Sequence, residues 1–276
     1  MPSPKTVKTR FTIISDTHAK QPFPAGNTKH AYRLPLPKAD VLIHSGDLTQ
    51  WGALMEHEST FDVLREANAE IKISAWRGSM KDYDDAVEMW TGKDAKMAGI
   101  VYLEEGVRTF ELKNGAIFTV YTSPYTPEYC DTAFDYPRDH DRFNPPNPDS
   151  KFQAPNPIPS WPGVDIIITH GPPHGILDKV RSGDNAGCVN LFAADKRARP
   201  RIHCFGHIHE GWGAERYNWV RKSANPVLTN KTSVLKDGSA QLYLAADGGK
   251  LLKFGEETVF INAAIMDQSN NPGHAP

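Results

Sequence analysis

The stretch from Ile202 to His209, IHCFGHIH, places two histidines directly after a short apolar run. An apolar run of this length is typical of a buried strand. His207 and His209 would then follow the end of that strand, and strand ends in an open α/β sheet are where ligands collect. Taken alone, the pair could equally be two structural histidines, so its interpretation depends on what the rest of the chain supplies.

Three further apolar runs are followed by polar residues in the same way. The first precedes Asp16 and His18, the second precedes Asp47, and the third precedes His170. Singly, each could be a helix cap or a hydrogen-bonded core residue. Together with the histidine pair, two carboxylates and four imidazoles suit a pair of divalent transition metals. The three runs are Phe11–Ile14, Val41–Ile43 and Val164–Ile168.

Between these motifs the chain alternates short β runs with helical periodicity. Apolar residues at helical spacing predict a helix over Leu54–Glu70 and a shorter one over Asp84–Trp90. A turn signal at Asn114-Gly115 predicts a β meander around it. Alternation followed by a meander favours a mixed sheet, or two sheets, flanked by helices. The predicted strands of this part and of the C-terminal part are Ile71–Ser74, Ile100–Leu103, Arg108–Leu112, Ile117–Thr122 and Thr258–Asn262.

The segment Ser123–Gly163 is rich in Pro, Asn and Asp, which argues against a regular element there. A loop of this length in a compact domain is usually functional or disordered. Its aromatic residues, among them Tyr125, favour a role as the wall of a pocket. Trp51, close to the turn at Asp47, would suit a planar base or an aromatic small molecule, although ordinary core packing explains such aromatics equally well.

The composition narrows the class of protein. With 276 residues and a formal net charge of −2, a single domain over 1–276 with a small-molecule substrate is the simplest expectation. Neither a nucleic acid polymer nor a membrane is an expected partner. The N-terminus lacks the apolar segment of a secretory signal, which predicts a cytoplasmic protein. A flexible N-terminus, about 1–9, and a frayed tail, about 268–276, are expected, and the oligomeric state stays open.

In this order, the motifs resemble those of the calcineurin-like metallophosphoesterase superfamily, whose pattern runs D-x-H, G-D, G-N-H-D/E, a central histidine and G-H-x-H. Longer strings are similar to its MPPED/239 branch, and the resemblance covers most of Phe11 to Gly213. It implies a four-layer α/β sandwich, in which two mixed β-sheets pack together and are flanked by helices. The strings are Asp40–Thr49, Ser123–Cys130, Thr169–Asp178 and Phe205–Gly211.

The resemblance also implies a site for one or two divalent ions. Carboxylate and imidazole ligands suit Mn, Fe, Zn or Mg, so the identity of the ions stays open. The first ion would be held by Asp16, His18, Asp47 and His209. The second would be held by the bridging Asp47, His170, His207 and the asparagine of G-N-H. Asp47, His170 and His207 would take part in catalysis, with Trp51, Tyr125 and His174 as substrate contacts.

The chain departs from the family pattern after its third predicted strand. Where G-N-H-D/E is expected, residues 74–82 read SAWRGSMKD. Gly78, Ser79 and Met80 then take the places of the asparagine, the histidine and the acidic residue. Shifting the alignment by one residue supplies neither an asparagine ligand nor a histidine acid. The first metal site is therefore complete in the sequence, whereas the second lacks a ligand and the usual acid is absent.

The implied activity is hydrolysis of a small phosphomonoester or phosphodiester, for example a nucleotide, weakened by the missing motif. His174 or His44 could replace the missing acid. Two alternatives stay open. One is a repurposed metal-dependent enzyme that acts on a non-phosphate small molecule, and the other is a non-catalytic member that binds nucleotides.

Overall fold

The computed structural model describes residues 7–75, 83–129, 134–146, 148–149, 151–227, 231–244 and 251–276. The smaller of its two main sheets has four parallel strands in chain order. Most side chains of these strands are buried, as expected of a parallel sheet that is covered on both sides. They are β1 (Phe11–Ile14), β2 (Val41–His44), β3 (Ile71–Ala75) and β4 (Ile100–Leu103).

The larger sheet has seven strands and is mixed. In spatial order they are β12 (Ser223–Pro226), β11 (Gly213–Asn218), β13 (Glu257–Asn262), β10 (Ile202–Phe205), β9 (Ile166–Thr169), β6 (Ile117–Ser123) and β5 (Gly106–Glu111). The four strands β13, β10, β9 and β6 run parallel to one another. The strands β11, β12 and β5 pair antiparallel with their neighbours.

Alternating side chains on the strands separate the core into layers, because successive residues point to opposite faces. On β1, Ile13 packs between the two sheets, whereas Ile14 packs on the opposite face with residues of the first helices. On β9, Ile166 and Ile168 fill the space between the sheets. Ile167 instead packs with residues of α4 (Val189–Ala198).

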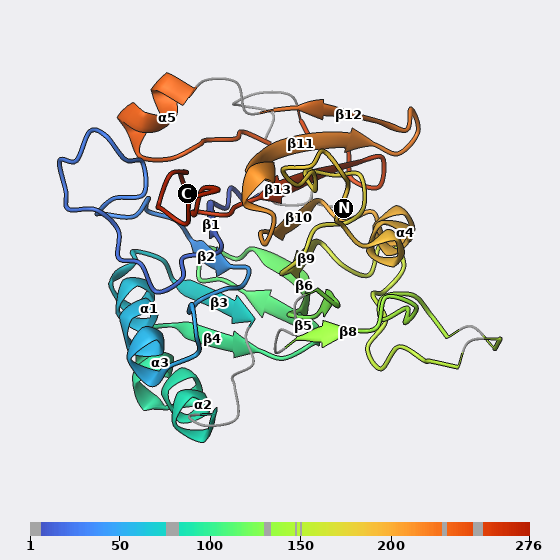
Figure 1. The fold of residues 1–276 in the computed structure, drawn as a ribbon, viewed down its shortest axis with the longest axis horizontal. Coiled ribbons are helices and arrows are strands. Elements are labelled where there is room, and N and C mark those ends of the chain that lie inside the picture. Colours follow the sequence, from blue (N-terminus) through green and yellow to red (C-terminus); the bar gives the residue numbers. More distant parts are fainter. Residues whose placement is uncertain are drawn as a thin grey trace.

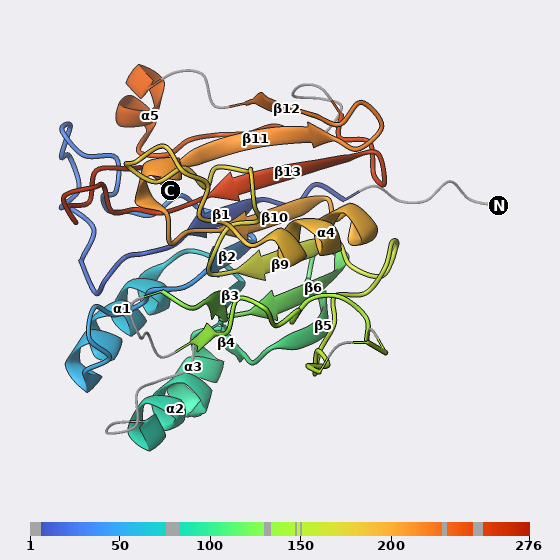
Figure 2. The same cartoon turned by 45° about the vertical axis from the view of Figure 1, so that its right-hand side comes forward.

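Helices cover the outer face of each sheet (Figure 1, Figure 2). The first three, α1 (Leu54–Glu66), α2 (Tyr83–Thr91) and α3 (Lys93–Met97), gather beside the smaller sheet, and α4 lies beside the larger one. This arrangement confirms the predicted four-layer α/β sandwich. Two shorter helical segments are α5 (Lys231–Asp237) and η1 (His209–Gly211).

The predicted β meander is wrong. Ile100–Leu103 forms β4 at the edge of the smaller sheet, whereas β5 and β6 form a hairpin in the larger sheet. The chain crosses from one sheet to the other at Glu104 and Glu105, and a local turn signal at Asn114 carries no information about that crossing. The smaller sheet is also wholly parallel rather than mixed.

Two local predictions differ from the structure as well. The helix predicted to reach Glu70 ends at Glu66, because Ala67 adopts extended backbone (φ −62°, ψ 133°). The proline-rich segment after β6 contains two short paired strands, β7 (Thr126–Pro127) and β8 (Asp135–Tyr136).

The predicted frayed tail, 268–276, is instead packed against the domain. Met266 pairs with Pro272, and the indole of Trp212 donates a hydrogen bond of 3.1 Å to the backbone oxygen of Ala275. The side chain of Ala275 is buried as a result. The predicted flexible N-terminus, 1–9, lies largely outside the described residues, which begin at residue 7.

The two sheets meet beside the ends of β1 and β13. The backbone N–H of Ser15 donates to Ala263, and the backbone N–H of Ile265 donates to Ser15, both at 2.9 Å. These bonds place the loop after β1 next to the larger sheet, so that side chains from both sheets can reach one site. Within the described ranges, none of the helices has the length and apolar character needed to cross a membrane.

Candidate metal centre

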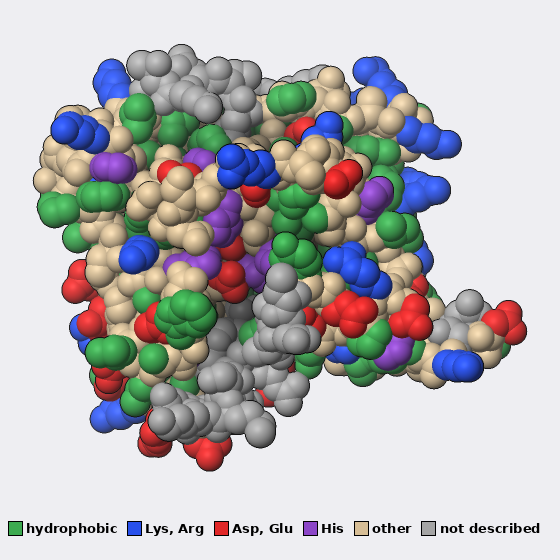
Figure 3. Space-filling view, viewed as in Figure 1, with side chains coloured by type: hydrophobic (Ala, Val, Ile, Leu, Met, Phe, Trp, Pro, Cys, Tyr) green, Lys and Arg blue, Asp and Glu red, His purple; other side chains and the backbone are tan. Residues whose placement is uncertain are grey.

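Three side chains that follow β1 and β10 form a first candidate metal group. One ligand atom from each of Asp16, His18 and His209 lies within 4.8 Å of the other two. The Nε2 atom of His209 is 3.4 Å from Oδ1 of Asp16, and the side chain of Asp16 is fully buried. Figure 3 shows histidine and acidic side chains gathered near the middle of the face seen in Figure 1.

A second group shares Asp16 with the first. It consists of Asp16, Asp47 and His170, whose ligand atoms again lie within 4.8 Å of one another. The two carboxylate oxygens of Asp47 face different histidines. Oδ1 lies 3.2 Å from Nε2 of His170, and Oδ2 lies 3.6 Å from Nε2 of His18. Asp47, a member of the second group, therefore also faces His18 of the first group, and 41% of its side chain is open to solvent.

His207 lies beside these groups, although its ring belongs to neither of them among the described residues. The centre of its ring is 4.9 Å from that of His170. Its backbone N–H donates to both carboxylate oxygens of Asp16 at 3.0 Å. Burial, together with nearby His170, lowers the pKa of the His207 imidazole to about 4, which keeps the ring neutral at pH 7.

Four of the candidate ligands have a left-handed backbone conformation, which residues other than glycine rarely adopt. Their φ angles are 52° at Asp16, 47° at His18, 50° at Asp47 and 67° at His207. Such strain persists only where surrounding contacts impose it, and it concentrates at functional sites. Here the backbone N–H of Asp16 donates to Gly46, and that of His18 donates to Asp47, which locks the two loops together.

Hydrogen bonds orient two of the imidazole rings. Nδ1 of His18 lies 2.9 Å from Oε1 of Gln50, and Nδ1 of His209 lies 3.2 Å from the backbone oxygen of Asp267. Since these acceptors occupy Nδ1, the other nitrogen of each ring is left for a cation. Buried Nε2 of His18 has no hydrogen-bond partner among the described residues. The donors therefore fit a divalent metal ion.

The charges of the cluster also suit a cation. Burial would raise the pKa of Asp16, but its hydrogen bond with His209 and the other nearby imidazoles hold it well below its usual range. Burial opposes protonation of His170, yet Asp47 outweighs it and raises the pKa of His170 to about 9. Burial would likewise raise the pKa of the partly exposed Asp47, but His170 outweighs it and lowers that pKa, so both carboxylates favour the ionised form and a divalent cation would balance their charge.

The chain matches the model of a known protein family. The family model of the calcineurin-like phosphoesterases matches residues 9–211, which is well over half of the chain and includes all six candidate ligands named above. The chain belongs to the calcineurin-like phosphoesterase family. The aspartate and histidine groups are candidate metal sites of the kind that this family uses.

Two curated proteins and one solved structure are similar to this chain. The human "Metallophosphoesterase domain-containing protein 1" is 30% identical over 74% of this chain and 62% of its own length. The "Probable rhamnogalacturonate lyase C" of Emericella nidulans is 31% identical over 76% of this chain and 18% of its own length. The crystal structure of TT1561 of Thermus thermophilus covers 85% of this chain and 98% of its own, with 11% identity and a TM-score of 0.47. The chain thus spans less than two thirds of the length of either curated relative.

The three residues predicted to contact a substrate differ in exposure. Trp51 is 82% exposed, and its backbone N–H donates to Glu56 at 2.9 Å, which fixes the loop that presents it. His174 is also exposed, with 44% of its side chain accessible. Tyr125 is half-buried, and the guanidinium of Arg142 lies over its ring at 3.7 Å.

The two groups proposed as replacements for the missing acid also differ. His44 is fully buried, and its Nε2 lies 2.8 Å from the hydroxyl of Thr17, so it supports the loop after β1. Burial lowers the pKa of His44 to about 3. His174 keeps its exposed ring 3.9 Å from Asp178. The residues that replace the G-N-H motif, Gly78 to Met80, lie outside the described part of the chain.

Sequence reasoning missed the residues that orient the candidate ligands. Gln50 carries no motif that separates it from other polar loop residues. Asp267 acts through its backbone oxygen, which any residue would supply. Asn262, the last residue of β13, donates to the backbone oxygen of Ile208 at 2.8 Å. A polar side chain at the end of an apolar strand, where the family resemblance weakly resumes, does not reveal this contact.

Proposed function

We propose that this protein hydrolyses small phosphoesters with the help of divalent metal ions. The observation that supports this most strongly is the pair of candidate ligand groups that share Asp16, in which Asp47 of the second group also faces His18 of the first. Asp16, His18, Asp47 and His209 would hold the first ion. Asp47, His170 and His207 would hold the second.

The residues of the chain would have different roles at such a site. A bound divalent ion supplies Lewis acidity, since it withdraws charge from a phosphate oxygen and lowers the pKa of a water molecule. Asp16 and Asp47 provide the negative charge that retains the cations. His207 offers a neutral ring at pH 7, because its pKa is lowered to about 4. Trp51 and His174 are exposed and would contact the substrate, whereas the ring of Tyr125, beneath Arg142, would support the loop.

The activity would be weaker than that of a member with a complete motif. Gly78 and Ser79 supply neither the amide ligand nor the imidazole acid at their positions. The second ion would therefore be held less tightly, and the leaving oxygen would lack its usual proton donor. A small substrate such as a nucleotide, rather than a nucleic acid polymer, agrees with the net charge of −2, because binding to a polymer depends on many positively charged contacts.

Restoring the motif tests this proposal. The double variant Gly78→Asn, Ser79→His should regain a ligand and an acid together, and phosphodiesterase activity should rise by roughly 10²–10⁴-fold, which is the usual contribution of general acid catalysis. The matched control carries the same two changes together with Asp47→Asn, and it should gain nothing. A flat response of the double variant, measured with both ions bound, would count against the proposal.

The same departure at Gly78 and Ser79 favours a second candidate function. A repurposed enzyme would keep the metal ions as Lewis acids for a non-phosphate small molecule. A screen of aryl phosphates, cyclic nucleotides and non-phosphate esters separates the two candidates. Turnover only of the non-phosphate esters, with their hydrolysis impaired in the restored double variant, would favour the second. Tight nucleotide binding without any turnover would favour a binding protein instead.

A further inference from the structure

The turn that carries His207 and His209 connects β10 to β11. In the larger sheet, β13 lies between these two strands. Its last residue, Asn262, pairs with Phe205 on β10 and with Gly213 on β11. Asn262 therefore lies where the turn leaves one strand and returns to the next.

The carboxamide of Asn262 is almost completely buried, at 1% exposure, and each of its polar atoms is used. Nδ2 donates to the backbone oxygens of Ile208, at 2.8 Å, and Leu177, at 3.2 Å. Oδ1 accepts a hydrogen bond of 3.2 Å from the backbone N–H of Ala264. An amide nitrogen has two N–H donors, so these two carbonyl groups account for both of them.

The two carbonyl groups belong to segments that matter for the metal centre. Ile208 stands between the candidate ligands His207 and His209, and Leu177 lies in the loop that follows His170. Leu177 has a left-handed backbone, with φ 50°. A side chain at Gly211 would place its Cβ only 1.9 Å from the oxygen of Leu177. The turn and the loop therefore approach each other closely, with the carboxamide joining them.

We infer that Asn262 is a positioning residue of the metal centre. It acts through the backbone between His207 and His209 and through the loop after His170. Without its donors, two carbonyl groups in a closely packed region would lose hydrogen bonds, which is costly enough to shift a turn. The inference rests on the metal site of the proposed function, but it does not depend on phosphoester hydrolysis.

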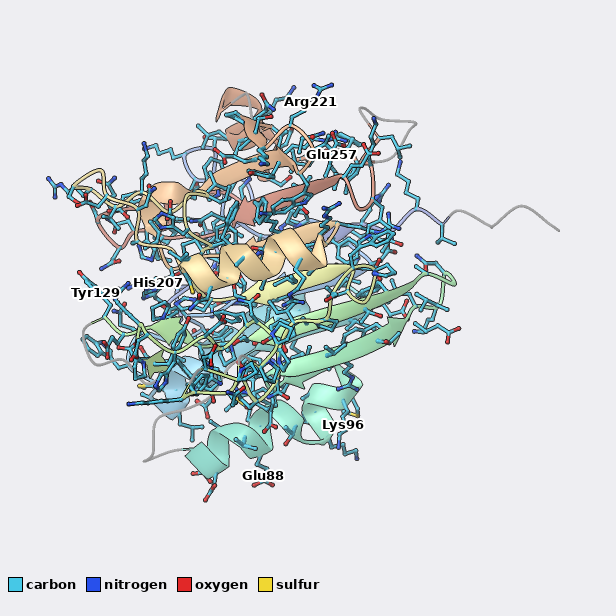
Figure 4. The ribbon with its side chains drawn as sticks, turned by 90° about the vertical axis from the view of Figure 1, so that its right-hand side faces the viewer. Glu88, Lys96, Tyr129, His207, Arg221 and Glu257 are labelled. Atoms are coloured by element: carbon cyan, nitrogen blue, oxygen red, sulfur yellow. The ribbon has the colours of Figure 1, made fainter. Side chains whose placement is uncertain are left out.

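The test compares two asparagine variants in the full chain. Asn262→Leu keeps a similar size but removes both donors, and the affinity of the metal-free protein for Mn²⁺ should fall by roughly 10–100-fold, as for other partners that orient ligands. The matched control is Asn218→Leu. Asn218 lies at the other end of the β11–β13 ladder, pairs with Glu257 and donates to its carboxylate at 3.4 Å. In Figure 4, Glu257 lies well away from His207, so Asn218→Leu should bind Mn²⁺ as the parent protein does.

Urea unfolding of the metal-free variants separates positioning from general support. A dissociation constant describes the folded protein, so lower stability alone leaves it unchanged. Equal Mn²⁺ affinities for the parent and Asn262→Leu would overturn the inference. It would also be overturned if metal-free Asn262→Leu failed to fold, because Asn262 would then support the sheet as a whole. If Asn262→Leu loses Mn²⁺ affinity and the parent protein hydrolyses no phosphoester, this inference is upheld and the proposed function is rejected.

Discussion

His18 presents one ring nitrogen to the metal centre because Gln50 occupies the other. Replacing Gln50 with alanine removes the acceptor of the Nδ1–H group, so the ring can rotate and change its tautomer. Metal affinity should fall by about 10–100-fold, the usual effect of losing such a partner. Titration of the metal-free protein with Mn²⁺ measures this change.

The control for this experiment is Gln241→Ala. Gln241 is exposed, and its side chain forms hydrogen bonds with those of Ser239 and Tyr243. The substitution should leave Mn²⁺ affinity unchanged. If both glutamine variants bind Mn²⁺ equally well, the orienting role of Gln50 is wrong.

His44 makes the stability of the metal-free protein depend on pH. Burial lowers its pKa to about 3, from the value of 6.5 that it has in an unfolded chain. Above pH 6.5 the ring is neutral in both states, so this contribution to stability is complete. As the pH falls, His44 takes up a proton in the unfolded chain but not in the folded protein. The free energy of unfolding therefore decreases by about 2 kcal/mol between pH 7.5 and pH 5.

The variant His44→Gln removes that titrating group. Its free energy of unfolding, measured in urea with a chelator present, should fall less steeply with decreasing pH than that of the parent. The slope is the informative quantity, because the substitution also changes the level of stability. Parallel slopes would mean that His44 is not held neutral in the folded state.

The motifs predicted which residues would lie together far better than how their side chains would be oriented. The order of Asp16, Asp47 and His209 in the sequence was enough to expect a shared site, and the structure brings these residues together. The left-handed backbone at Asp16 and Asp47 was not predictable, since loop hydrogen bonds impose it. Orientation by Gln50 was equally hidden, because one side-chain contact between two loops leaves no periodic pattern.

At the scale of elements, position 46 in the loop after β2 has room only for glycine. Gly46 has φ 135°, and a Cβ there would lie 2.3 Å from Nδ1 of His170. Gly46→Ala should therefore displace His170 and lower Mn²⁺ affinity at least about tenfold, beyond the backbone strain of roughly 1–2 kcal/mol that positive φ imposes on alanine.

Gly115→Ala is the matched control. Gly115 also has positive φ, at 88°, but no atom lies within 4 Å of its Cβ position among the residues that the structure describes. It should lose stability through backbone strain and keep its metal affinity. Similar Mn²⁺ affinities in the two alanine variants would show that the approach of Gly46 to His170 has no bearing on the site.

The elements themselves were predictable where a single strand or helix decides the pattern. The apolar runs located β1, β2, β9 and β10 because these strands are buried on both faces. Strand partners were not predictable, since pairing depends on contacts between distant segments. For this reason the sequence pattern predicts a meander of Ile100–Leu103 with β5, although Ile100–Leu103 pairs with β3 in the other sheet.

On the scale of the whole molecule, the metal centre draws on both sheets. Asp16, His18 and Asp47 follow strands of the smaller sheet, and His170 and His209 follow strands of the larger one. Bound metal should therefore stabilise the complete domain. At a concentration of roughly 100 times the dissociation constant, the gain is about 2.7 kcal/mol, which corresponds to an increase in Tm of roughly 5–10 °C for a domain of this size.

Thermal unfolding with and without Mn²⁺ measures this gain. The variant Asp16→Asn keeps the shape of the side chain but removes a charge from both ligand groups, so its Tm should respond little to Mn²⁺. A full increase in Tm for Asp16→Asn would place the stabilising ion elsewhere in the molecule.

The bonds between Ser15 and the segment after β13 have a consequence for how the protein is made. Ser15 leaves the ribosome early, whereas its partners, Ala263 and Ile265, are added only after the strands of both sheets have been synthesised. Contacts between such distant parts of a chain form slowly and late in folding. The nascent chain must therefore carry the loop after β1 without these two hydrogen bonds until the segment after β13 has been synthesised, so the link between the two sheets at this place is completed late.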